Sequence, residues 1–164
     1  EHLFWSVPRA ERVAVTAEVV DRAGPTIVFT RTRHGADRLA HQLARRGVRA
    51  EAIHGRRSQA QRDRALRRFR AGAVDALVAT DVAARGIHVD GVACVVHFDV
   101  PGDAKDYVHR SGRTGRAGAT GAVVSLVAED SRRAVRALQR DAGVAGPIER
   151  PDPARLPAPV PAAR

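Results

Sequence analysis

Residues 75–86 read DALVATDVAARG, an aliphatic run that passes directly into a polar turn and then into small residues. Such a short, continuous apolar run, bounded by turn residues, is typical of a strand buried on both faces of a sheet. The small residues after Asp81 favour the start of a helix. This stretch therefore predicts a strand, a polar loop and a helix, which is the repeating unit of a parallel α/β fold.

Runs of the same kind recur along the chain and alternate with amphipathic segments. The sequence predicts further strands at His2–Val7, Thr26–Thr30, Ala50–His54, Ala93–Phe98 and Gly121–Val127. It predicts helices at Arg9–Arg22, Gly35–Arg46, Gln59–Ala71, 103–116 and Glu129–Asp141. Aliphatic strands joined by helical crossovers predict an α/β fold whose mainly parallel sheet is covered on both faces.

Polar residues follow the predicted strands at their carboxyl ends, which is where parallel sheets bind ligands. They are Thr30-Arg31-Thr32, His54-Gly55, Thr80-Asp81 and Asp99. We expect the functional site at this edge of the sheet.

The charge of the chain indicates a polyanionic partner. Its 164 residues suffice for one domain, and 28 basic residues against 18 acidic ones give a net charge of +10. Lys105 is the only lysine, so part of the arginine content reflects codon usage rather than function.

The single cysteine and the hydropathy pattern favour the cytoplasm. Cys94 excludes an internal disulfide and lies in an apolar run, where a buried, inert thiol is expected. No apolar stretch approaches the ~20 residues that span a bilayer, so a membrane partner is not expected.

The composition changes at Gly146. Six of the nine prolines lie in residues 147–164, and apolar periodicity stops. We therefore predict a domain over residues 1–145 and a proline-rich flexible tail or linker over 146–164.

A dense cationic motif follows the predicted strand at Ala93–Phe98. It reads His109-Arg110-Ser111-Gly112-Arg113-Thr114-Gly115-Arg116. Guanidinium groups stay charged and match phosphate oxygens, and glycine permits close backbone approach. The motif favours a phosphate site, where charge develops during phosphoryl transfer. The alternative, a solvated basic helix face, is outweighed by the motifs upstream.

Four motifs in order carry a family resemblance. They are IVFTRT at 27–32, His54-Gly55 followed by SQAQR at 58–62, ATDVAARG at 79–86 and HRSGRTGR at 109–116. Over residues 2–142 the chain resembles the C-terminal RecA-like domain of superfamily 2 DEAD-box RNA helicases, most closely the bacterial RhlE-like group. The resemblance implies a RecA-like three-layer sandwich.

For RNA, the resemblance implies contacts to the sugar–phosphate backbone. The matching positions are Thr32, Gly55, Gln59, Arg62, Thr80 and Gly86. Thr32 is also a candidate N-cap for the helix that follows, and the two roles are compatible.

For ATP, the resemblance implies that Arg113 and Arg116 act as arginine fingers on the γ-phosphate. His109 and Arg110 match catalytic positions that couple the nucleotide and RNA sites. His88 stands where the family usually has an aspartate at the ribose, and Asp90 is a candidate substitute.

The chain contains no GxxxxGK[ST] loop and no Asp-Glu-Ala-Asp box, which hold ATP and Mg²⁺ on the first domain of such helicases. We therefore expect a fragment that needs an N-terminal RecA-like domain and does not hydrolyse ATP alone, and we expect no metal ligands here. Two alternatives stay open, a DNA-directed superfamily 2 helicase domain and a non-catalytic RNA-binding module.

Overall fold

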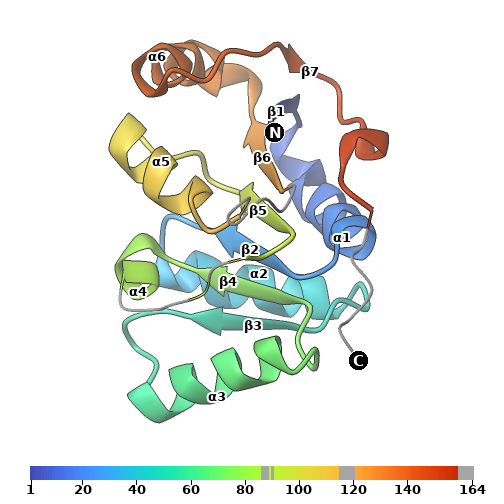
Figure 1. Ribbon diagram of the computed structural model, residues 1–164, viewed down its shortest axis with the longest axis vertical. Coiled ribbons are helices and arrows are strands. Elements are labelled where there is room, and N and C mark those ends of the chain that lie inside the picture. The colour runs from blue at the N-terminus through green and yellow to red at the C-terminus, as the bar shows by residue number, and fades with distance from the viewer. Residues whose placement is uncertain (86–88, 90, 115–120, 159–164) are drawn as a thin grey trace.

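A computed structural model of the chain describes residues 1–85, 89, 91–114 and 121–158. These residues form a sheet of seven strands in the order β3-β4-β2-β5-β6-β1-β7 (Figure 1), and each pairing between them is parallel. The strands are β1 (His2–Ser6), β2 (Thr26–Phe29), β3 (Ala50–Ile53), β4 (Ala76–Ala79), β5 (Cys94–His97), β6 (Ala122–Val127) and β7 (Ile148–Glu149). The predicted RecA-like three-layer α/β fold is confirmed.

Helices cover both faces of the sheet. Helices α1 (Arg12–Ala23) and α2 (Arg33–Ala44) pack on one face. The other face carries α3 (Gln59–Arg70), α4 (Asp81–Arg85), α5 (Ala104–Ser111) and α6 (Arg132–Ala142). Short 3₁₀ turns at Arg9–Glu11, Glu129–Ser131 and Pro153–Arg155 complete the described elements. Figure 1 shows β3 at one end of the sheet beside α3, and β7 at the other end.

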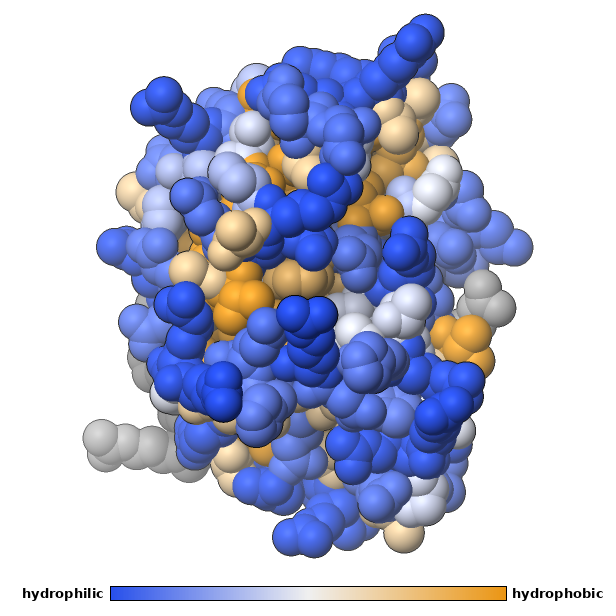
Figure 2. All heavy atoms as spheres, turned by 180° about the vertical axis from the view of Figure 1, so that it is seen from behind, coloured by the Kyte–Doolittle hydropathy of each residue, from blue (hydrophilic) through white to orange (hydrophobic). Residues whose placement is uncertain are grey.

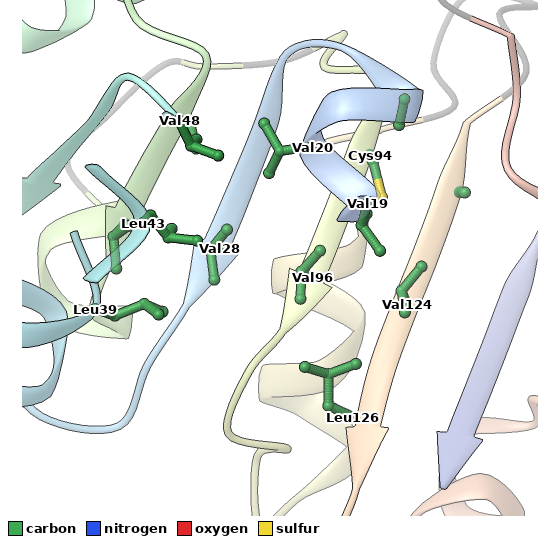
Figure 3. Close-up of a cluster of buried hydrophobic side chains, with 14 of the residues drawn as sticks. Val19, Val20, Val28, Leu39, Leu43, Val48, Cys94, Val96, Val124 and Leu126 are labelled. Atoms are coloured by element: carbon green, nitrogen blue, oxygen red, sulfur yellow. The ribbon is translucent and has the colours of Figure 1, made fainter. Parts of the chain in front are cut away.

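Alternate residues of each strand enter opposite cores, as the period of a strand requires. In β2, Val28 faces α1 and α2 whereas Ile27 and Phe29 face the opposite helices. Figure 3 shows Val28 among Leu39 and Leu43 of α2, with Val96 and Val124 from neighbouring strands. Both faces are therefore dry, which explains why these strands read as continuous apolar runs.

The helix starts are built from local side-chain hydrogen bonds. Ser58 caps α3 in a reciprocal capping box, with its Oγ accepting from the Gln61 N–H and the Gln61 side chain accepting from the Ser58 N–H. Asp103 caps α5 through a single hydrogen bond, in which its side chain accepts from the Asp106 N–H. Helix α5 ends at Ser111, earlier than the predicted residue 116, because Gly112 terminates it and Thr114 then pairs with Val92.

Part of the segment after Gly146, for which the sequence predicts a flexible tail, packs on the domain. β7 extends the sheet through its pairing with β1, and Leu156 is buried in the α1 side of the core. Arg155 also forms ion pairs with Glu1 and Glu149. Proline suits an edge strand and a 3₁₀ turn because neither needs every backbone N–H. A single buried apolar residue such as Leu156 gives no periodic pattern in the sequence, so its packing could not be predicted.

Cys94 is fully buried, as expected, and this burial raises the pKa of its thiol to about 12. None of the helices that the structure describes combines the length and the apolarity needed to cross a membrane.

We predict that Leu156→Ala lowers the free energy of unfolding by about 2–4 kcal/mol, because the substitution leaves a cavity in the core. Urea denaturation measures the change. The control is Val108→Ala, which trims an exposed apolar side chain and should shift stability by less than about 0.5 kcal/mol. Equal, small effects would show that residues 147–158 do not pack on the domain in solution.

Candidate functional site

The candidate residues gather at the carboxyl edge of the sheet because parallel strands all end there. Thr32 follows β2, Gly55 follows β3, Thr80 follows β4 and Asp99 follows β5. In Figure 1 the arrowheads of β3 and β4 point to the side on which α4 lies. Residues from four separate stretches of sequence are thereby brought to one edge.

Arg110 is the centre of this edge, with only 4% of its surface exposed. Its Nε and Nη2 donate to the two carboxylate oxygens of Asp81, at 2.5 and 2.6 Å. Its Nη1 donates to the carbonyl oxygen of Asp99, at 2.8 Å. This bidentate, charge-assisted arrangement fixes α5 to the first residue of α4 and to the end of β5.

Arg110 rests on a buried aromatic layer. Its guanidinium lies 5.2 Å from the centre of the Phe29 ring. Behind it, His97 stacks between Phe29 and Tyr107, with ring centres 6.2 and 4.8 Å away. Tyr107 is completely buried and its hydroxyl lies 2.7 Å from Nδ1 of His2. Tyr107 therefore serves packing beneath α5.

His97 is held in its neutral form. Burial, and then the nearby charge of Arg110, move the pKa of His97 well below its usual value. Arg110 can only donate, so Nδ1 of His97 accepts at 3.4 Å. Nε2 therefore carries the proton and donates to Ser111 Oγ at 3.3 Å. His97 thus supports two consecutive residues of the HRSGRTGR motif.

Asp99 ties two further segments to the same edge. Its Oδ2 accepts from the backbone N–H of Arg31 at 2.9 Å, and its Oδ1 accepts from Arg12 at 3.0 Å. The Arg12 guanidinium also covers the Phe98 ring, 4.1 Å from its centre. The loop after β2, which carries Thr32, is therefore joined to the loop that holds Arg110.

The structure places the predicted arginine finger Arg113 beyond the end of α5, partly exposed. Its Nη2 donates to the carbonyl oxygen of Ala84 in α4, at 2.9 Å. His109 is exposed on α5. The remaining nucleotide-site and loop predictions, Arg116, His88, Asp90 and Gly86, lie outside the described residues.

Three of the predicted RNA-binding residues also make local contacts. Thr32 caps α2, its Oγ1 accepting from the Gly35 N–H at 2.9 Å, so the N-cap prediction is confirmed. Gln59 Oε1 accepts from Arg62 Nη2 at 2.9 Å. Within the described ranges, the buried Nε of Arg62 has no hydrogen-bond partner, so this guanidinium is only partly satisfied. Gly55 is exposed, and Thr80 is buried.

Sequence reasoning missed Asp37, which orders the loop after β3. His54 Nδ1 accepts from the Arg56 N–H, so its Nε2 donates to Asp37 Oδ1, at 2.9 Å. Arg57 contacts the same oxygen at 3.1 Å. Burial opposes ionisation of Asp37, but the hydrogen bond from His54, followed by the charge and hydrogen bond of Arg57, lowers its pKa. No sequence motif includes Asp37, because Asp37 lies in α2 whereas its partner His54 follows β3.

The edge offers donors that suit phosphate oxygens. Arg113 and Arg62 are partly exposed guanidinium groups, and Arg62 keeps a buried N–H without a partner among the described residues. These groups fit an anionic ligand such as a nucleotide or an RNA backbone. The same described residues contain no cluster of three His, Cys, Asp or Glu side chains placed to hold a metal ion.

Comparison with protein families matches residues 11–118 to the helicase conserved C-terminal domain. The chain is 44% identical over 138 residues to the mitochondrial DEAD-box ATP-dependent RNA helicase 9 of Arabidopsis thaliana, which covers 84% of the chain and 22% of that protein. It is 43% identical over 142 residues to the DEAD-box ATP-dependent RNA helicase CshA of Bacillus subtilis, covering 85% of the chain and 29% of CshA. The chain thus spans less than a third of these relatives.

Solved structures give the same similarity. The DEAD-box protein SrmB of E. coli, bound to regulator of ribonuclease activity A, superposes with a TM-score of 0.83 at 32% identity, covering 100% of this chain and 95% of that one. Dbp5 of S. cerevisiae bound to RNA and ADP BeF3 gives a TM-score of 0.79 at 30% identity, covering 91% and 40%.

We predict that acidification below about pH 6.5 destabilises the domain through His97. Below this pH the unfolded chain takes up a proton on His97 and the folded chain does not. The free energy of unfolding therefore decreases as the pH is lowered, by up to about 1.4 kcal/mol per pH unit. Urea denaturation at pH 7, 6 and 5 measures the loss, which His97→Asn should reduce.

The control is His2→Asn, because burial and then the charge of the chain's amino group also lower the pKa of His2. His97→Asn should reduce the acid-induced loss of stability more than His2→Asn does. An identical pH profile in wild type and His97→Asn would contradict a neutral, buried His97.

Proposed function

The chain belongs to the family of helicase conserved C-terminal domains, in its DEAD-box branch, and we propose that it forms the C-terminal half of an ATP-dependent RNA helicase. Within the longer protein it supplies arginines to the phosphates of ATP and one side of a clamp on the RNA backbone. The observation that carries this proposal is the Arg110–Asp81 ion pair, which joins the ATDVAARG loop to the HRSGRTGR motif at the carboxyl edge.

On the nucleotide side, Arg113 and Arg116 act as arginine fingers that stabilise charge on the transferred phosphoryl group. Arg113 holds the carbonyl oxygen of Ala84 in the isolated domain. Domain closure brings this guanidinium to an anionic phosphate, with which it forms a charge-assisted bond. His88, or Asp90 in its place, contacts the ribose.

On the RNA side, Thr32, Gly55, Gln59, Arg62, Thr80 and Gly86 contact phosphates and sugars. Arg62 is suited to this role because Gln59 fixes one of its terminal nitrogens while its Nε has no partner among the described residues. Contacts of this kind carry little base information, so binding is independent of sequence and weakens steeply with salt.

Arg110 couples the two sides as a positioning residue. Its three bonded nitrogens are committed to Asp81 and Asp99 within the domain, so it does not reach a ligand itself. A shift of α5 on nucleotide binding is transmitted through Asp81 to the loop that begins with Thr80. His109, exposed on α5, faces the other domain.

ATP and Mg²⁺ are held chiefly by the N-terminal RecA-like domain, which supplies the phosphate-loop lysine and acidic residues that this sequence lacks. The present residues orient the phosphates and complete the charge around them. The 164-residue chain therefore does not turn over ATP by itself.

We predict that Arg113→Ala lowers kcat by about 10³-fold or more in the chain joined to a DEAD-box first domain, because a finger acts on the transition state. RNA-stimulated ATP turnover is the measurement. Arg113→Lys, which keeps the charge without the planar fork, recovers only part of the rate. The RNA affinity of both variants should stay within about twofold of the wild-type value, because the substitutions affect kcat alone.

Two results would contradict this assignment. One is ATP turnover by the 164-residue chain alone, and the other is normal turnover in Arg113→Ala. Efficient unwinding of DNA duplexes but not RNA duplexes would instead assign the domain to a DNA-directed enzyme.

We predict that the two roles of Thr32 separate in a pair of variants. Thr32→Asp keeps an N-cap acceptor and so preserves stability, but it places a negative charge beside the RNA phosphates. Thr32→Ala loses the cap, at a cost of about 1 kcal/mol. Fluorescence anisotropy with single-stranded RNA should show weaker binding for Thr32→Asp than for Thr32→Ala. The reverse order would leave Thr32 with the capping role alone.

A further inference from the structure

The strand β3 ends the sheet, and its outer edge has no neighbouring strand among the described residues. The carbonyl oxygens of Arg49 and Ile53 accept from Ala76 and Thr80 in and after β4. Odd-numbered residues therefore bond to β4, and the backbone N–H and C=O groups of Ala50 and Ala52 point outward. No hydrogen bond from the described ranges reaches them.

This free edge forms the floor of a groove of 560 Å³ between α2 and α3. Ala50 and Ala52 contribute small side chains to the groove, whereas Glu51 between them also lines it and pairs with Arg68. Four outward backbone groups in a groove must be satisfied by water or by a ligand. Their spacing fits a peptide in the extended conformation, which would add a strand to the sheet.

The two walls of the groove differ in chemistry. On the α2 side, Ala40 and Ala44 present small apolar side chains, and Asp37 and His41 of the same helix also line the groove. On the α3 side, Gln61, Arg64 and Arg68 lie at i, i+3 and i+7, which places them on one stripe of the helix. Side chains of an added strand would point alternately to these two walls. The groove therefore selects an alternating sequence.

Arg64 identifies the charge that such a strand should carry. Arg57 pairs with Asp37, and Arg68 pairs with Glu51 of β3. In the part of the chain that the structure describes, Arg64 has no ion-pair partner, although it lines the groove. Figure 2 shows that the lower part of the molecule, where Figure 1 places α2 and α3, is mostly hydrophilic. An acidic side chain on the α3 side would satisfy Arg64.

We propose that the β3 edge is a docking site for an extended peptide of a partner protein, with alternating small apolar and acidic residues. The peptide pairs with the outward backbone groups of Ala50 and Ala52. It sets its apolar side chains against Ala40 and Ala44 of α2 and a carboxylate against Arg64. This site lies along the sheet edge, outside the proposed fingers and RNA contacts, and does not depend on the proposed function.

The test uses the 164-residue chain and a blocked, fluorescein-labelled peptide of alternating valine and glutamate, eight residues long. Fluorescence anisotropy should show saturable binding. In ¹H–¹⁵N spectra the amide signals of Ala50 and Ala52 should shift, and their hydrogen exchange should slow. The valine–lysine peptide should bind at least about 10-fold more weakly, since charge-assisted contacts become repulsive.

Matched variants separate the groove from general electrostatics. Arg64→Glu should weaken binding about 10-fold or more, whereas Arg67→Glu, the same change on a residue that does not line the groove, should stay within about threefold. Ala50→Pro removes an outward N–H that no strand uses, so binding should fall while thermal unfolding changes little. Arg64→Glu keeps the test decisive if Ala50→Pro does not fold.

Equal binding of the glutamate and lysine peptides would overturn the proposal, and so would unshifted Ala50 and Ala52 amides. Oligouridine that shifts the same two amides and displaces the peptide would also overturn it, because the groove would then be a path for RNA.

Discussion

The ion pair between Arg110 and Asp81 is the interaction on which the carboxyl edge depends. It joins residues 29 positions apart at distances of 2.5 and 2.6 Å, and the same guanidinium holds the Asp99 carbonyl oxygen. Asp99 in turn binds Arg12 and the Arg31 N–H. Five segments are thus fixed to one another around one buried side chain. A charge this deeply buried is stable only because its partners are in place.

The surroundings of Arg110 follow from that constraint. A second cation beside it would be repelled, and His97 is accordingly buried in a form that resists protonation. The stacked rings of Phe29, His97 and Tyr107 exclude water from one side of the guanidinium. Arg113 lies three residues after Arg110, on the short turn that follows α5. The fixed position of Arg110 therefore also restrains the position of Arg113. In the proposed finger role, an Arg113 held in this way would need little reorganisation on binding phosphate.

Six of the seven described strands could be predicted, and so could the helices, because apolar runs and caps are local; β7 lies in a segment without apolar periodicity. The carboxyl-edge location of Thr32, Gly55, Thr80 and Asp99 followed from the parallel sheet alone. The Asp37–His54 contact and the burial of Leu156 could not, since both depend on residues distant in sequence with no periodic signal. The pairing of Arg110 with Asp81 was also hidden, because an arginine motif looks the same whether its members face ligand or protein.

A double-mutant cycle on the two partners tests the central role of this pair most directly. Asp81→Leu, Arg110→Met and the double variant would be compared by urea denaturation and by RNA-stimulated ATP turnover in the chain joined to a DEAD-box first domain. Each single variant should lose about 3 kcal/mol or more by leaving one charge unpaired, and the double variant should lose less than the sum. Turnover should be lost in all three, since the segment that carries Arg113 is released. Additive stability losses, or full turnover in Arg110→Met, would contradict the account.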